Sequence, residues 1–119
     1  MLVFHIEQSR TWWGEKERIN IKGGEMPAYL IGHITVKDPV QWGVYVKGVR
    51  ESLLPFNGRT LFRGKRASVL AGEHPYDLAV VIEFSDQESL QSWYDSEEYQ
   101  KLIPIRDRAA DVAIISYDA

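Results

Sequence analysis

His33 and Glu83 are the two side chains of this sequence best suited to acid–base chemistry. Both fall on the less bulky side of an alternating, strand-like stretch, AYLIGHITV at residues 28–36 and LAVVIEF at residues 78–84. If these strands are neighbours, an imidazole and a carboxylate on one shared face could act as a general acid and base, with Tyr29 as a hydrogen-bond donor. The structural alternative, which we favour, is that Glu83 makes a hydrogen bond or salt bridge and His33 is a satisfied core or rim histidine.

Five further side chains are candidates for ligand binding. Arg63 and Arg106 could clamp an anionic ligand, because a guanidinium forms paired hydrogen bonds with a carboxylate, although ion pairs with the chain's own acids are more common. His74 lies in GEHPYD, a glycine- and proline-containing stretch that predicts a loop, where function often resides. Trp93 and Tyr94 could wall an aromatic pocket, although aromatic residues at helical spacing are usually core residues.

The composition argues against several classes of site and partner. The chain has no cysteine, which excludes disulfides, thiolate metal ligands and a cysteine nucleophile. The three histidines lack metal-ligand spacing and no phosphate-binding glycine motif is present, so we expect no metal and no cofactor. A net charge of −3 provides no basic footprint for nucleic acid. No segment approaches the roughly 20 apolar residues that span a bilayer, so we expect a soluble, cytoplasmic protein without membrane or nucleic-acid partners.

Four strands are predicted from alternating and β-branched residues. The second is expected to break at Gly64, as a bulge or tight turn. The predicted strands are residues 28–36, 59–62 continued by 66–71, 78–84 and 111–117.

Two helical regions are predicted between these strands. Asp38, followed by a proline, can cap the first helix with its carboxylate. Ser85 with Glu88 three residues later forms a capping-box pattern for the second, which a further cap at Ser96 and an interruption at Pro104 make irregular. The resulting order, βαββαβ, predicts an α+β, ferredoxin-like antiparallel sheet with two helices on one face.

Residues 1–25 differ in character from the rest of the chain. They mix aromatic, charged and glycine residues without a helical or strand period. The codons of Lys22 to Glu25 are compatible with a purine-rich ribosome-binding site directly before Met26. We therefore expect residues 26–119 to form a single domain, and residues 1–25 to be a leader that arises from a misassigned start or a cloning remnant.

Several segments of the predicted domain also carry a family resemblance. They are MPAYLIGHITVKDP at residues 26–39, FRG at 62–64, GEHPYD at 72–77, VVIEF at 80–84 and SWYDSEEYQKLIPIRDRAAD at 92–111. Together they resemble the bacterial family called domain of unknown function 1330, over residues 26–118. The resemblance implies a dimeric α/β barrel, a superfamily that includes cofactor-independent monooxygenases, muconolactone isomerases and haem enzymes. The activity of the family itself is not established.

Two classes of function are compatible with these observations. One is binding or transformation of a small organic molecule without metal or nucleotide; the other is a non-catalytic dimerisation or ligand-sensing module. A cavity bordered by Glu83 and His33 would favour the first, and a sheet face filled with side chains the second. Because two helices cover one face only, Ile31, Val81 and Ile115 are left on an apolar opposite face, which predicts a homodimer formed sheet to sheet.

Overall fold

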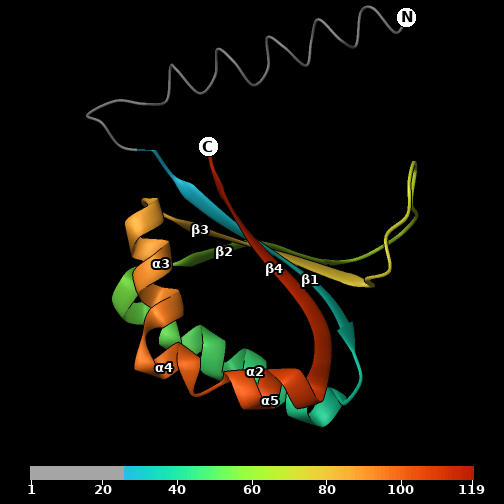
Figure 1. Ribbon diagram of the computed structural model, residues 1–119, viewed down its shortest axis with the longest axis horizontal. Coiled ribbons are helices and arrows are strands. Elements are labelled where there is room, and N and C mark those ends of the chain that lie inside the picture. The colour runs from blue at the N-terminus through green and yellow to red at the C-terminus, as the bar shows by residue number, and fades with distance from the viewer. Residues whose placement is uncertain (1–25) are drawn as a thin grey trace, which may run out of the picture.

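The computed structural model describes residues 26–119. The predicted leader, residues 1–25, lies outside the described residues. The elements, shown in Figure 1, are β1 (Ala28–Val36), α2 (Pro39–Ser52), a short 3₁₀ turn η1 (Leu54–Phe56), β2 (Arg59–Lys65), β3 (Leu78–Phe84), α3 (Gln87–Asp95), α4 (Glu97–Gln100), α5 (Ile103–Ala109) and β4 (Ala110–Asp118).

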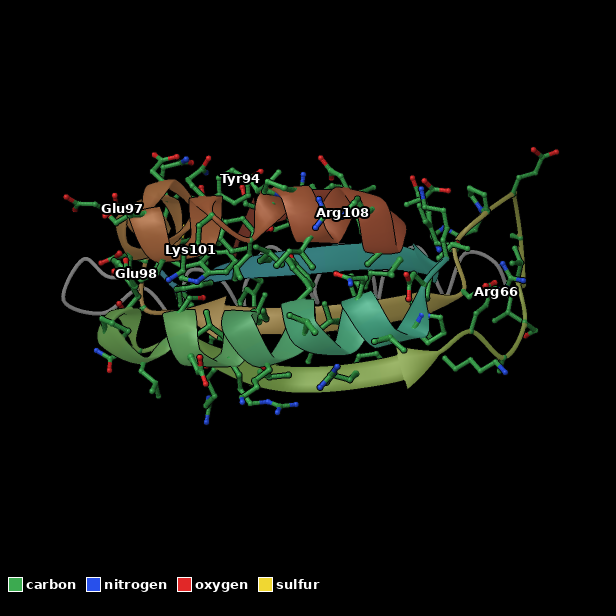
Figure 2. All side chains as sticks on the ribbon, turned by 90° about the horizontal axis from the view of Figure 1, so that it is seen from below. Arg66, Tyr94, Glu97, Glu98, Lys101 and Arg108 are labelled. Atoms are coloured by element: carbon green, nitrogen blue, oxygen red, sulfur yellow. The ribbon has the colours of Figure 1, made fainter. Side chains whose placement is uncertain are left out.

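The strands form one four-stranded sheet in the order β2-β3-β1-β4. Every neighbouring pair is antiparallel. The helices of residues 26–119 lie on one side of the sheet in Figure 1, and Figure 2 shows α2 and the α3–α5 segment side by side across it. The predicted α+β, ferredoxin-like architecture is therefore confirmed, with its second helical region divided into three short helices.

The alternation along β1 and β3 decides which side chains meet the helices. Leu30 and Ile34 of β1, together with Ile82 and Phe84 of β3, are buried beneath the helices. Successive side chains of a strand point to opposite faces, so Tyr29 and its alternate neighbours on β1 lie on the uncovered face. The predicted assignment of the two faces is confirmed.

Helix α2 begins where the sequence predicts. The Asp38 side chain accepts hydrogen bonds from the backbone amides of Val40 and Gln41, at 3.1 and 3.2 Å, and Pro39 occupies the first turn. These contacts satisfy amides that have no partner inside the helix. The apolar residues of α2, which begin at Trp42, face the sheet and pack against the core.

The cap of α3 differs from the prediction. Asp86, not Ser85, is the N-cap, and its carboxylate accepts a hydrogen bond of 2.7 Å from the Ser89 amide. The helix therefore begins one residue later, at a carboxylate whose charge suits the positive end of the helix dipole. Ser96 does cap α4, as predicted, by accepting from the Tyr99 amide. Pro104 was expected to interrupt a helix, but it lies in the first turn of α5, where proline loses no hydrogen bond.

The second strand is shorter than predicted. It ends at Lys65, which pairs with Leu78, the first residue of β3, so residues 66–71 have no strand left to pair with. Leu70 in this segment is 96% exposed. The irregularity of β2 falls between Thr60 and Phe62 instead of at Gly64.

The core lies between the helices and the covered face of the sheet. Its largest fully buried side chains are Phe84, Trp93 and Tyr99. Trp93 and Tyr99 have ring centroids 4.5 Å apart, and Phe84 lies 5.6 Å from Trp93, so the short helices α3 and α4 are held through aromatic packing.

None of the helices described is both long and apolar enough to cross a membrane.

Candidate functional site

Glu83 lies on the uncovered face and is hydrogen-bonded to side chains of both neighbouring strands. It accepts a 2.9 Å hydrogen bond from the Tyr29 hydroxyl on β1 and a 2.6 Å hydrogen bond from Arg59 on β2. The Arg59 contact, followed by the Tyr29 contact, lowers the pKa of Glu83. Burial, and then the contact with Glu83, raise the pKa of Tyr29. Both partners are side chains of this same chain, and the lowered pKa keeps the carboxylate ionised. The arrangement therefore agrees with the structural alternative, in which Glu83 makes a hydrogen bond and a salt bridge.

His33 does not reach Glu83. In the register of β1 and β3, His33 lies opposite Ala79, whereas Glu83 lies opposite Tyr29. Four residues of strand separate the two side chains, which is roughly 13 Å. The predicted acid–base pair is therefore not assembled within one chain, although both residues share a face.

The neighbours of His33 come from the loop between β2 and β3. Its ring centroid lies 4.9 Å from that of His74 and 6.1 Å from that of Tyr76. The buried Nδ1 of His33 has no hydrogen-bond partner among residues 26–119. Burial, and then His74, lower the pKa of His33, so the ring is neutral around pH 7.

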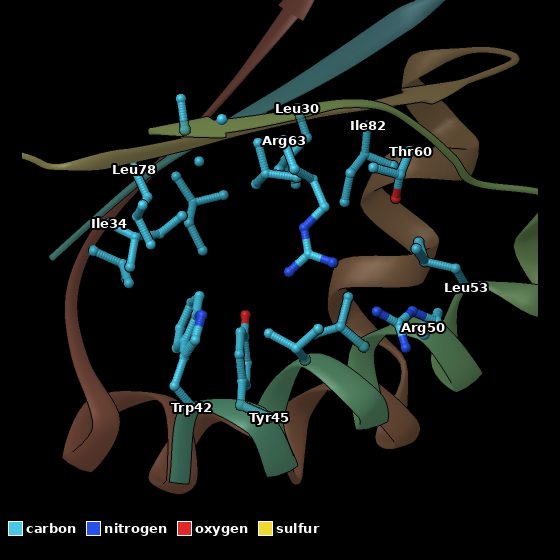
Figure 3. Close-up of a pocket in the computed structure, with 18 of the residues that line it drawn as sticks. Leu30, Ile34, Trp42, Tyr45, Arg50, Leu53, Thr60, Arg63, Leu78 and Ile82 are labelled. Carbon is cyan, nitrogen blue, oxygen red and sulfur yellow. The ribbon is translucent and has the colours of Figure 1, made fainter. Parts of the chain in front are cut away.

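A cavity of about 300 Å³ lies on the opposite side of the sheet, between the strands and α2 (Figure 3). Its volume is at the lower end of the range of small-molecule sites, roughly 300 to 1,000 Å³. Aliphatic side chains of β1, β3 and β4 form one wall, and the apolar stripe of α2 forms the other. The lining comprises Leu30, Gly32, Ile34, Trp42, Tyr45, Val46, Val49, Arg50, Leu53, Thr60, Arg63, Gly64, Leu78, Ala79, Val80, Ile82, Trp93, Val112 and Ile114.

Few polar groups border this cavity, and the charged ones are both arginines. Arg63 lies opposite Val80 in the sheet, on the covered side, and Figure 3 shows its guanidinium extending from β2 toward Tyr45. Arg50 approaches from α2, and Thr60 adds a hydroxyl from β2. The lining contains no Asp, Glu or His. Among residues 26–119, neither Arg50 nor Arg63 takes part in an ion pair.

A hydrogen-bonded network fixes the end of the cavity at Tyr45. The Tyr45 hydroxyl lies 2.8 Å from that of Tyr99, which accepts a 3.0 Å hydrogen bond from Arg106. Arg106 also donates to Asp107 at 3.1 Å, and its side chain is only 13% exposed. Burial and the neighbouring Tyr99 raise the pKa of Tyr45, so its phenol stays protonated. Arg106, a predicted ligand clamp, is therefore used inside the protein to join α5 to α4 and α2.

The remaining predicted residues divide between packing and the cavity. Trp93 reaches the cavity, but it is 2% exposed and its indole N–H donates to the Ser52 hydroxyl at 2.9 Å. Tyr94 packs against Trp93 and is not part of the lining. His74 lies beside His33, away from the cavity. Among the described residues, no three His, Asp or Glu side chains come together as a metal site would need.

Sequence reasoning placed Arg63 and Trp93 among the candidates but missed Tyr45, Arg50 and Thr60. The signal for Tyr45 was present, because it follows Trp42 at helical spacing. That spacing predicts a buried stripe, and it cannot distinguish a stripe packed against side chains from one that faces a cavity. Nothing in the local sequence marks Arg50 or Thr60.

The element order, the antiparallel sheet and the one-sided helical layer define a ferredoxin-like fold. Solved structures share this fold at low sequence identity. RPA0582, a protein of unknown function from Rhodopseudomonas palustris, gives a TM-score of 0.69 at 13% identity, covering 87% of this chain and 88% of its own. A dimeric ferredoxin-like protein of unknown function from Thermobifida fusca gives 0.56 at 18% identity, covering 84% and 97%. SnoaB, a cofactor-independent oxygenase from Streptomyces nogalater, gives 0.57 at 9% identity, covering 79% and 93%.

A comparison with curated proteins found no match. The family model described as "Domain of unknown function (DUF1330)" matches residues 27–118. The chain therefore belongs to this family, which confirms the resemblance carried by its sequence segments.

Proposed function

We propose that this protein binds a small, largely apolar organic molecule in the cavity between α2 and the sheet. The observation that carries the proposal is a cavity of about 300 Å³ with aliphatic and aromatic walls and a few convergent polar groups. Such a combination is typical of small-molecule sites, where apolar walls supply affinity and a few polar groups orient the ligand. The cavity lies on the other face from Glu83 and His33, so this proposal does not use the predicted acid–base pair.

Binding is favoured over acid–base catalysis by the chemistry of the lining. Arginine, tyrosine, tryptophan and threonine can donate hydrogen bonds, but the lining offers no carboxylate or imidazole to accept a proton. SnoaB is an oxygenase with this fold, but a fold alone does not specify an activity. Within the alternative class, a non-catalytic ligand-sensing module would also use this cavity, whereas a module that only dimerises would not.

Two probes of the same shape and different charge test the proposal: 2-naphthoate and its neutral amide, measured by isothermal titration calorimetry. At least one should bind to the intact chain. Val46→Phe, which places a ring in the cavity from α2, should abolish binding. Val44→Phe is the matched control, because Val44 is on the same helix, 50% exposed and not part of the lining. The proposal fails if neither probe binds, or if the Val46 variant binds as well as the control.

We further propose a homodimer formed through the uncovered sheet face. Ile31 and Val81 lie opposite each other near the centre of this face, with Ile115 next to Ile31 on β4. Ile115 is 42% exposed and Phe62, beside Val81 on β2, is 53% exposed. A face this apolar is unusual for a surface in permanent contact with water, and burying it against a second copy would stabilise both chains. The Thermobifida fusca neighbour is described as dimeric.

Light scattering at micromolar concentration tests this assembly. The intact chain should have the mass of two chains, and Ile115→Glu should shift it toward one, because a charge would be buried in the interface. Val44→Glu, on the helical side, is the control and should remain dimeric. A monomeric mass for the unmodified chain would refute the sheet-to-sheet dimer.

A further inference from the structure

The charge of the cavity lining contrasts with the charge of the whole protein. The chain carries a net charge of −3, but the charged residues of the lining are Arg50 and Arg63 alone. Among the described residues, Arg59, Arg66 and Arg106 pair with carboxylates, whereas Arg50, Arg63 and Arg108 do not. Arg50 and Arg63 are exposed to solvent, but unlike Arg108 they also border an apolar cavity, where the negative charge of a ligand can pair with a guanidinium.

The position of Arg63 suits recognition of a ligand. Its backbone is held in the sheet by pairing with Val80, so the side chain starts from a fixed point on the covered face. From there the guanidinium enters the space between the sheet and the aromatic side chains of Trp42 and Tyr45 (Figure 3). A guanidinium is always charged, presents its donors in a planar fork and pairs with a carboxylate through two parallel hydrogen bonds. Thr60, on the same strand, can donate a further hydrogen bond.

We propose that the ligand is an organic acid, with an apolar body between β1, β3 and α2 and a carboxylate held by Arg63. This inference rests on the proposed binding function and specifies its ligand class. Arg50 adds a second positive charge and raises the local concentration of anions without being required for the paired contact. The aliphatic walls formed by Leu30, Ile34 and Leu78 take the hydrocarbon part.

A polyphosphate or nucleotide fits this site poorly. Phosphate groups are usually held by successive backbone amides at a helix N-terminus or a glycine-rich loop. The lining residues of α2 run from Trp42 toward its C-terminal end, and the start of the helix is capped by the protein's own Asp38. The walls are too apolar for several charges, whereas a single carboxylate on a hydrocarbon body matches them.

The experiment compares the affinities of 2-naphthoate and 2-naphthamide for three forms of the full chain. The unmodified protein should bind the acid about 10-fold to 100-fold more tightly than the amide, the range expected for a hydrogen-bonded charge pair. Arg63→Gln should remove this preference while leaving the amide's affinity within a few-fold. Lys65→Gln is the matched control, because Lys65 is exposed, lies two residues further along β2 and is not in the lining, so the preference should persist.

The two proposals fail in different ways. Equal affinity for acid and amide in the unmodified protein, with both lost in Val46→Phe, would overturn the organic-acid inference and leave the binding function standing. Equal loss of preference in the Lys65 and Arg63 variants would assign the effect to overall charge and would also overturn the role of Arg63. Absence of binding by both probes would overturn the binding function itself.

Discussion

Tyr99 is the centre of the hydrogen-bonded network that joins α2, α4 and α5. Removing its hydroxyl, or that of its partner Tyr45, tests how much each hydrogen bond at this end of the cavity contributes to the stability of the protein. The hydroxyl is shared by Tyr45, at 2.8 Å, and Arg106, at 3.0 Å. Tyr99→Phe removes both contacts, whereas Tyr45→Phe removes one and leaves Arg106 donating to Tyr99. Both changes keep the ring, so packing is little altered.

The expected magnitudes follow from the partners that each change leaves behind. Tyr45→Phe should lower the free energy of unfolding by about 1 kcal/mol, the net value of one neutral hydrogen bond. Tyr99→Phe should lower it by about 3 kcal/mol, because it removes a hydrogen bond to a charged group and leaves the buried Tyr45 hydroxyl unpaired. Adding Tyr45→Phe to Tyr99→Phe should then cost little, and could restore some stability, because the unpaired hydroxyl is removed.

Urea denaturation followed by circular dichroism measures these differences. All variants should be compared at one protein concentration, since the proposed dimerisation would make stability depend on concentration. The dependence of the unfolding free energy on urea should not change if the variants alter stability alone. A cost for Tyr45→Phe equal to or greater than that of Tyr99→Phe would contradict the role of Tyr99 as the shared partner.

Three further results are expected. Ser52→Ala should lower the free energy of unfolding by about 1 to 3 kcal/mol in urea denaturation, because it leaves the buried indole N–H of Trp93 without an acceptor; Ser52→Thr, which keeps the hydroxyl, should cost less. The pKa of His33 is lowered by burial and then by His74, so the unfolded chain binds more protons, and the free energy of unfolding should fall as pH drops below about 6.5. His33→Gln should flatten that dependence between pH 7 and pH 5, and an unchanged slope would exclude His33 as its source. Removal of residues 1–25 should leave a cooperative thermal transition, since the described residues form a buried core of their own between Ala28 and Ala110; loss of cooperativity would show that residues 1–25 are structural.

Local sequence patterns were enough to predict the layers of this protein. Alternation along residues 28–36 and 78–84 assigned the correct side chains to the covered face, because a strand's side chains alternate whatever its partners are. Asp38 and Ser96 were predicted as caps because a cap is a contact between residues two or three apart.

The site depended on relations that no local pattern contains. Strand register places His33 opposite Ala79 and so separates it from Glu83, although sequence alone put both on one face. The end of β2 at Lys65 was decided by where β3 begins, which is a property of the partner strand. The choice of Asp86 over Ser85 as cap depended on which of two adjacent side chains the packed helix brings to the Ser89 amide.

The cavity shows the same division between sequence and tertiary structure. The sequence by itself determined that Trp42 and Tyr45 share the inward side of α2, because 3.6 residues per turn bring them together. Only the tertiary structure decided that this side faces about 300 Å³ of open space and that Arg63 enters it from β2. The physical reason is that the separation of a helix from a sheet is set by the summed volumes of side chains from distant segments, a quantity that the spacing of residues within one helix does not contain.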